Sequence, residues 1–134
     1  MDTLALARRW RDAWAEAWPR RDVDAIAVLY RSGAAYRSHP LRDASTPRAY
    51  LERVFAEEEA IDCRFGDPLV AGDRAAVEWW ASYREAGEDV TLAGTTVLRF
   101  GPDGLVSEHV DYWVEGSGRT PPFPGWDGSG DLAT

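Results

Sequence analysis

Apolar residues recur at spacings of three and four near the start of the chain, and this spacing predicts an amphipathic helix. Leu6, Trp10, Trp14 and Trp18 fall on one face of that helix, with mainly small, polar and charged residues between them. Pro19 follows the last of these positions and is expected to end the helix, because proline removes a backbone hydrogen bond and clashes with the preceding turn. The tryptophan face should be buried against the rest of the protein.

Two further helices are predicted from their start and stop signals. Asp22 is a typical N-cap and apolar positions continue to Tyr30, so a short helix is expected to follow Asp22 and to stop at Gly33. Thr46 followed by Pro47 indicates the start of a third helix, because an N-cap residue and a proline at the first helical position both favour it. Residues 34–38 are expected to form one short strand between these two helices.

The second half of the chain has the composition of β-strands. Glycine-containing turns separate its apolar segments, so consecutive strands are expected to pair antiparallel as a meander. Helices followed by an antiparallel sheet make an α+β layer fold. The four segments, rich in Val, Trp, Thr, Tyr and Phe, lie near residues 61–70, 74–84, 89–100 and 105–115.

Glycine and proline mark the C-terminal end of the chain. We expect one folded domain over residues 1–117 and a Pro/Gly-rich extension over residues 118–134. The prolines exclude a helix or a central strand in this extension. Phe123 and Trp126 are large and apolar, so they are expected to pin residues 118–126 to the body of the protein.

Composition and charge exclude several classes of partner. The chain has 134 residues, the size of one domain, and 23 acidic residues against 15 basic ones give a net charge of −8. Nucleic acids and anionic membrane surfaces are unsuited as partners, because their phosphates would be repelled. No apolar run reaches the length of a membrane span and the first residues lack the features of a signal peptide, so we expect a cytoplasmic protein.

Missing residue types narrow the chemistry. The chain contains no lysine, asparagine or glutamine, which excludes a lysine Schiff base and an oxyanion hole made of side-chain amides. The single Cys63 excludes an intrachain disulfide and a zinc site made of cysteines. His39 and His109 stand in no metal-binding spacing, so we expect no metal and no cofactor.

Several passages of the sequence resemble a known family. Residues 21–42 resemble the passage from the second helix to the first strand in the nuclear transport factor 2-like superfamily. The runs DRAAVEWWASY, LAGTTVLRFGPDGLV and EHVDYW resemble successive strands of its SnoaL-like members, which are related to ketosteroid isomerases and polyketide cyclases. Together the resemblance covers about residues 6–115. It implies a cone-shaped α+β barrel, in which three N-terminal helices pack in a curved, mainly antiparallel sheet around an apolar pocket.

The resemblance points to His39 as a catalytic base. His39 precedes Pro40, where ketosteroid isomerases have an Asp-Pro pair whose aspartate shuttles the proton. An imidazole suits this role because its unperturbed pKa lies near neutrality. The alternative is a structural histidine that bonds a backbone carbonyl and stabilises the turn before Pro40.

Asp111 is the second candidate catalytic residue. The last strand alternates, so His109, Asp111 and Trp113 share one face. Apolar content alone would turn the opposite face inward, but related epoxide hydrolases and cyclases place an acidic residue of this strand in the pocket. We therefore expect His109, Asp111 and Trp113 to face in, with Asp111 as general acid or base or as the group that orients a histidine. The alternative is an aspartate paired with an arginine on the outer surface.

Aromatic residues are expected to complete the pocket. We expect Trp14, Tyr36 and Trp79 on its wall, although a tryptophan stripe such as the one containing Trp14 also suits a plain core. Isomerases of the family carry a tyrosine donor on the first helix. Here that helix has tryptophans, and Trp14, Tyr36, Tyr50 and Tyr83 all stay open as hydrogen-bond donors.

Epoxide hydrolases of the family use an Asp-Arg-Asp arrangement, which this sequence lacks. The arrangement needs an arginine and an aspartate within the strand that holds Glu78. Arg74 and Arg84 lie only near the ends of that strand, and its middle reads Trp-Trp-Ala-Ser. Glu78 itself is expected to face outward, because a strand glutamate is more often a surface charge than a pocket acid.

Two functions from different classes fit these features. The first is a cofactor-independent enzyme that performs proton transfer, isomerisation, dehydration or cyclisation on a small apolar substrate of carbonyl type, with His39 and Asp111 acting together. The second is a non-catalytic module that binds a hydrophobic ligand or dimerises, with its cone filled by tryptophans. A sheet this rich in Trp, Tyr and Val has apolar residues on both faces, so we also expect a homodimer through the outer face.

Overall fold

The first helix places a row of tryptophans inside the protein. In the computed structural model, which describes residues 2–127, α1 spans Thr3–Arg20 and buries Trp10, Trp14 and Trp18. Pro19 does not end the helix but lies in its last turn, which corrects the sequence-based expectation. Proline is tolerated there because the carbonyl that it leaves free, that of Ala15, accepts the thiol of Cys63 at 3.9 Å. The helix then ends at Arg21, in the left-handed conformation.

The second helix is shorter than predicted, and the strand after it is longer. Asp22 caps α2 as expected, but α2 spans only Val23–Ala27. Tyr30 and Gly33, expected in and after this helix, belong instead to β1, which spans Tyr30–Arg37. The reason is long-range pairing, because β1 forms a parallel ladder with the last strand of the chain. That ladder overrides the local helical pattern around Tyr30.

Thr46 caps the third helix, and strands make up most of the chain that follows. The Thr46 hydroxyl accepts a hydrogen bond from the N–H of Ala49, as the N-cap signal predicted. The expected strand over residues 61–70 is divided in two between Phe65 and Leu69, where Pro68 has no N–H to donate to the ladder. These elements are α3 (Pro47–Glu57), β2 (Glu58–Phe65), β3 (Leu69–Ala71), β4 (Arg74–Glu85), β5 (Glu88–Phe100) and β6 (Val106–Ser117).

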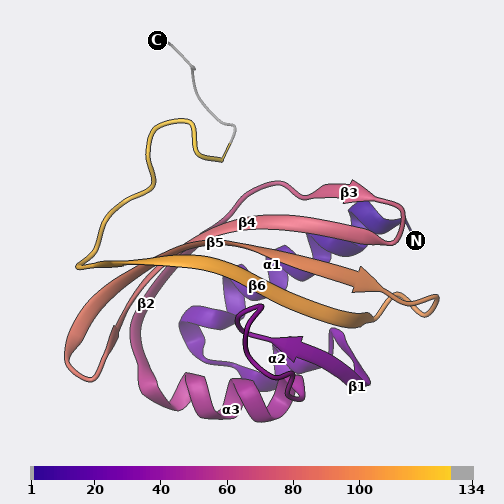
Figure 1. Cartoon of the computed structure of the whole chain (residues 1–134), viewed down its shortest axis with the longest axis horizontal. Coiled ribbons are helices and arrows are strands. Elements are labelled where there is room, and N and C mark those ends of the chain that lie inside the picture. Colours follow the sequence, from indigo (N-terminus) through magenta and orange to yellow (C-terminus); the bar gives the residue numbers. More distant parts are fainter. Residues whose placement is uncertain (1, 128–134) are drawn as a thin grey trace.

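The strands form one six-stranded mixed sheet that curves around the helices. Its order is β1-β6-β5-β4-β2, with β3 paired to β4 beside β2, and only the β1–β6 pair is parallel. Figure 1 shows α1 on one side of this sheet and α3 at the end where β2 begins. The predicted α+β cone is confirmed, although the sheet does not close into a complete barrel. None of the helices in residues 2–127 is long and apolar enough to cross a membrane.

The start of the C-terminal extension lies on the outer face of the sheet. Trp80, on β4, donates its indole N–H to the carbonyl of Thr120 at 2.7 Å and contacts the rings of Phe123 and Trp126 edge-on. Trp126 is buried, whereas Phe123 stays 60% exposed. The extension therefore covers Trp80 on the outside and, in the part that the structure describes, does not line the cavity inside the cone. Residues 128–134, the rest of the expected extension, lie outside the described residues.

Candidate functional site

The cone contains a cavity of about 390 Å³ between α1, α3 and the inner face of the sheet. The tryptophans of α1 and of the sheet form its wall and leave this space free. The cavity is therefore not filled in the way that a purely structural core would require. Its aromatic lining consists of Trp10, Trp14, Trp18, Tyr36, Tyr50, Phe55, Phe65, Trp79, Tyr83 and Trp113.

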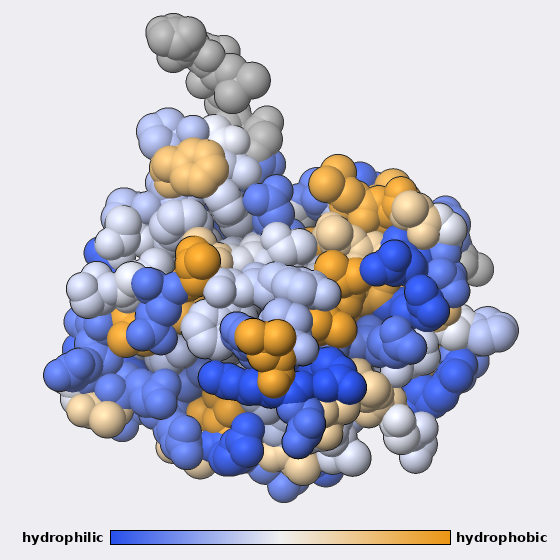
Figure 2. Space-filling view, viewed as in Figure 1, coloured by the Kyte–Doolittle hydropathy of each residue, from blue (hydrophilic) through white to orange (hydrophobic). Residues whose placement is uncertain are grey.

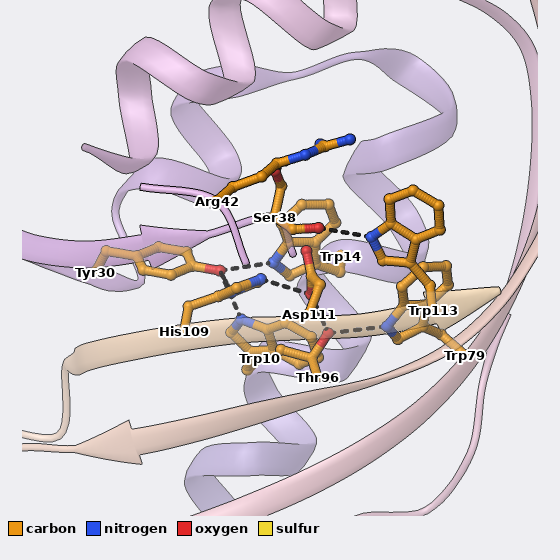
Figure 3. A network of polar contacts seen from close by, with 10 residues as sticks. All are labelled: Trp10, Trp14, Tyr30, Ser38, Arg42, Trp79, Thr96, His109, Asp111 and Trp113. Carbon is orange, nitrogen blue, oxygen red and sulfur yellow. Dashed lines mark hydrogen bonds and ion pairs between the residues drawn. The ribbon is translucent and has the colours of Figure 1, made fainter. Parts of the chain in front are cut away.

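A tyrosine hydroxyl organises the buried end of the site. The Tyr30 oxygen receives the indole N–H of Trp10 at 3.0 Å and that of Trp14 at 3.2 Å. It also lies 2.8 Å from Nδ1 of His109 (Figure 3). Burial raises the pKa of Tyr30 well above its usual value, so the phenol keeps its proton. Since the two indoles can only donate, the Tyr30 proton must be the one donated to His109.

This arrangement fixes the protonation of His109. Its Nδ1 accepts the proton of Tyr30, so the ring is neutral and its proton sits on Nε2. An imidazolium would present a second donor to an oxygen that two indoles already occupy. Nε2 lies 2.7 Å from Oδ1 of Asp111 and donates to it. His109 is 1% exposed and stacks on the ring of Tyr36, with centroids 3.8 Å apart, which prevents it from turning.

Asp111 is held by one oxygen and open at the other. Thr96 lies opposite Asp111 in the β5–β6 ladder and donates its hydroxyl to Oδ1 at 2.6 Å. The direction is set by Trp79, whose indole N–H donates to the Thr96 oxygen at 2.9 Å. Within residues 2–127 no hydrogen bond reaches the other oxygen, Oδ2, and no dashed line meets it in Figure 3. Asp111 is 9% exposed and lines the cavity, so Oδ2 is the oxygen available to a ligand.

A second buried carboxyl lies on the cavity wall. Glu58, the first residue of β2, is 4% exposed and receives the indole N–H of Trp18 on Oε1 at 2.8 Å. Desolvation by burial raises the pKa of this carboxyl to about 7, against the effect of the Trp18 hydrogen bond. The neighbouring carboxylates of Glu85 and Glu57 raise it further. Near neutral pH, Glu58 can therefore hold or release a proton.

The rim of the cavity carries two arginines. The Arg42 guanidinium lies over the Trp113 ring, 5.5 Å from its centroid, and that of Arg53 lies 5.6 Å from the Tyr50 centroid. Trp113 is itself held by its indole N–H, which donates to the carbonyl of Ser38 at 2.6 Å. Both arginines are exposed. The rim therefore places two positive charges at the solvent side of the cavity, above the buried network.

His39 stands apart from this network. Its Nδ1 accepts the backbone N–H of Leu41 at 3.1 Å, and its ring packs edge-on against Trp113. The carbonyl of His39 also accepts the N–H of Arg42, which closes the turn after Pro40. The imidazole is thus directed over its own turn and is not part of the cavity wall. The structure does not bring His39 and Asp111 together. His39 instead stabilises its own turn, as in the structural alternative, but it accepts a hydrogen bond from a backbone amide where a bond to a carbonyl was expected.

The other residues that the sequence analysis singled out lie on the side of the sheet where they were expected. Glu78 is exposed and faces outward. The cavity wall has no arginine beside Asp111 of the kind that the Asp-Arg-Asp arrangement needs, since the arginines that line it among the described residues are the two at the rim. The predicted residues on the cavity wall are Trp14, Tyr36, Trp79, His109, Asp111 and Trp113.

Sequence reasoning missed three polar members of the site. Tyr30 was assigned to a helix, and its role depends on the unexpected β1–β6 pairing. Thr96 could have been found, because it alternates with Gly94 and Leu98 on the inward face of β5. Glu58 lies in a run of three glutamates and had no distinguishing signal. Within residues 2–127 no group of three or more His, Cys, Asp or Glu side chains could hold a metal ion.

Comparisons with known proteins agree on one family. No curated protein sequence matches the chain. A hypothetical protein from Catenulispora acidiphila with a ketosteroid isomerase-like fold, solved in complex with trimethylamine, is 20% identical, with a TM-score of 0.67 over 77% of this chain and 83% of that one. A Mycobacterium tuberculosis LEH-like epoxide hydrolase is 15% identical, with a TM-score of 0.69 over 84% and 86%.

A third solved structure has the same fold. SalBIII, an epoxide hydrolase/cyclase-like enzyme with a role in pyran ring formation in the polyether salinomycin, is 18% identical, with a TM-score of 0.67 over 84% of this chain and 92% of that one. Identities this low establish the fold and not the activity. The family model for the SnoaL-like domain matches residues 7–109, which is most of the chain. The chain therefore belongs to the SnoaL-like domain family, with the cone fold of the nuclear transport factor 2-like proteins.

Proposed function

We propose that the protein is a cofactor-independent enzyme that abstracts a proton from a small substrate of carbonyl type, with Asp111 as the base. The observation that carries this proposal is the asymmetry of the Asp111 carboxylate. Oδ1 is fixed by His109 and Thr96, while Oδ2 faces the cavity without a hydrogen bond from residues 2–127. A desolvated carboxylate in fixed orientation is a stronger base toward a carbon acid than one in water.

The base role thus passes from His39, where the resemblance put it, to Asp111. His109 serves as a positioning residue, because its only free proton is already donated to Asp111. Deprotonation, isomerisation, dehydration and cyclisation all begin with such a base. The epoxide hydrolase and the cyclase-like relative support a reactive pocket in this fold, but their reactions are their own.

The proposal is tested with a general carbon acid, 5-nitro-1,2-benzisoxazole. The base removes the proton on C3 while the ring N–O bond breaks, which gives a nitrile and a coloured phenolate. We expect the protein to accelerate this reaction over acetate of equal concentration, and Asp111→Asn to lower the rate about 100-fold. Glu78→Gln, a carboxylate change on the outer face, is the control and should leave the rate unchanged.

The competing function is a binding module without catalysis. It would be favoured if the probe bound in the cavity but turned over no faster than with acetate, or if Asp111→Asn left the rate as it was. Probe binding is followed separately, by quenching of the tryptophan fluorescence of the cavity wall.

We also infer that the protein is a homodimer joined through the outer face of the sheet. Tyr112 and Val114 on β6 are 47% and 71% exposed, on the face opposite His109 and Asp111. Figure 2 shows further hydrophobic residues over β3. Light scattering at micromolar concentration should give about twice 14.9 kDa, and Val114→Arg should halve that mass. Leu41→Arg, on a loop and even more exposed at 89%, is the control; a monomeric unmodified protein would contradict the inference.

A further inference from the structure

We propose that the ligand of this cavity is a small organic cation, a tertiary or quaternary ammonium compound, whose charged end enters among the aromatic rings and lies against Asp111 and Glu58. This inference rests on the proposed function, because it names the class of substrate for the same site. It departs from the neutral apolar ligand that the sequence suggested. Three observations support it: the excess of negative charge in the cavity, the free oxygen on each of the two buried carboxyls, and the aromatic rings of the cavity wall.

The first observation is that the buried charge of Asp111 has no counter-ion. Its bonding partners are a threonine hydroxyl and His109, which the hydrogen bond from Tyr30 keeps neutral. No arginine of residues 2–127 forms an ion pair with Asp111. A buried carboxylate without a compensating charge is costly, and a cation at the open Oδ2 would supply that compensation.

The second observation is that other acidic side chains add to the negative charge of the cavity. Glu58 is buried, and Trp18 occupies only one of its oxygens. A cation beside it would favour the ionised form of a carboxyl whose pKa is about 7. The cavity wall therefore has a negative potential that attracts cations and disfavours anions. Among the described residues the carboxylates on this wall are Glu57, Glu58, Glu85, Asp111 and Glu115, against the guanidinium groups of Arg42 and Arg53.

The third observation is that the wall consists of aromatic rings, which bind cations through their faces. Two of them already do so, because Arg42 lies over Trp113 and Arg53 lies over Tyr50 at the rim. Both guanidinium groups are exposed at the rim, so neither covers Trp10, Trp14 or Trp18, which line the cavity further in. Methylated ammonium groups suit such a wall, because they carry charge on an apolar surface and form few hydrogen bonds.

A cationic substrate also fits the proposed base. A positively charged nitrogen close to a C–H bond acidifies it and stabilises the carbanion that forms when the proton leaves. The chain has no lysine and no side-chain amide with which to stabilise that charge, and residues 2–127 contain no cluster of metal-ligating side chains. The positive charge on the substrate itself would stabilise the carbanion.

The test compares choline with 3,3-dimethylbutan-1-ol, which has the same shape with a neutral carbon in place of the charged nitrogen. Binding is measured by quenching of tryptophan fluorescence at pH 8, which is above the pKa of about 7 of Glu58. We expect choline to bind at least about tenfold more tightly than the alcohol. Equal binding, tighter binding of the alcohol, or no choline binding at tens of millimolar would overturn the proposal.

Variants assign the preference to the two carboxyls. Asp111→Asn and Glu58→Gln keep the shape of each side chain and remove its charge, so each should lower the ratio of choline to alcohol affinity at least threefold. Glu78→Gln should leave the ratio unchanged. Circular dichroism verifies that each variant is folded. If one of the two variants does not fold, the other alone still tests the proposal. A preference for choline that survives both substitutions would also contradict the proposal.

Failure here is distinguishable from failure of the proposed function. The benzisoxazole probe is neutral, so its turnover depends on the base and not on a cation. If Asp111→Asn abolishes probe turnover while choline and the alcohol bind equally, the enzyme proposal stands and the cationic ligand does not.

Discussion

Replacement of Tyr30 by Phe is expected to lower the free energy of unfolding by about 4 kcal/mol, far more than the loss of one ordinary hydroxyl. The Tyr30 oxygen satisfies three buried groups at once: the indole N–H groups of Trp10 and Trp14, and Nδ1 of His109. Each buried polar group left without a partner costs about 1–3 kcal/mol. Phenylalanine fills the same space but leaves all three unsatisfied.

Urea unfolding of Tyr30→Phe beside Tyr36→Phe measures this effect. Tyr36 is also buried and contacts His109, but by stacking, and its hydroxyl makes no side-chain hydrogen bond among residues 2–127. The Tyr36 variant should lose less than about 1 kcal/mol. Similar losses in the two variants would mean that the hydroxyl of Tyr30 does not hold the network, and the neutral state assigned to His109 would lose its basis.

Gly94→Ala is expected to destabilise the protein by about 3 kcal/mol, because this position in β5 has no room for a side chain. A Cβ atom there would lie 2.5 Å from the backbone oxygen of Tyr112, 2.8 Å from the ring of Trp79 and 2.9 Å from Cβ of Trp113. The backbone oxygen cannot move without breaking the β5–β6 ladder. The Trp79 ring crosses β5 over Gly94 to reach Thr96, so the substitution should also disturb the support of Asp111.

The matched control for this prediction is Gly116→Ala on β6. A Cβ atom at Gly116 has no neighbour within 4 Å, and its backbone has no positive φ. Thermal unfolding of the two variants should show a large drop in melting temperature for Gly94→Ala and almost none for Gly116→Ala. If Gly94→Ala unfolds like the unmodified protein, the close crossing of Trp79 over β5 is incorrect.

The parts of the fold that depend on local signals could be predicted from the sequence. The cap residues Asp22 and Thr46 each begin the helix that they predict. Turns between strands gave the antiparallel order of β4, β5 and β6. Tyr30 could not be placed in this way, because its strand is defined by pairing with residues near Val106, more than seventy positions later. Local pattern and distant pairing disagree there, and the pairing prevails.

The candidate site was predictable to the same extent. Alternation along one strand put His109, Asp111 and Trp113 on a common face, and this needs no knowledge of the rest of the fold. The support of Asp111 by Thr96 depends on the register of two strands, which the sequence does not state. The position of the His39 side chain depends on how its turn folds back on itself. The resemblance rests on the proline that follows, Pro40, and a proline does not specify the direction of the preceding side chain.

The tryptophans that surround the site have a consequence for the route of the proton. An indole has a proton to give and no lone pair with which to take one, so Trp10, Trp14 and Trp79 close the inner side of the network to proton transfer. A proton accepted by Asp111 has no path into the protein and must leave from Oδ2, the same atom that received it. In the proposed reaction, one face of the substrate therefore both loses and regains the proton. Such one-sided return makes the transfer suprafacial, so the hydrogen would leave and re-enter on the same face of the substrate.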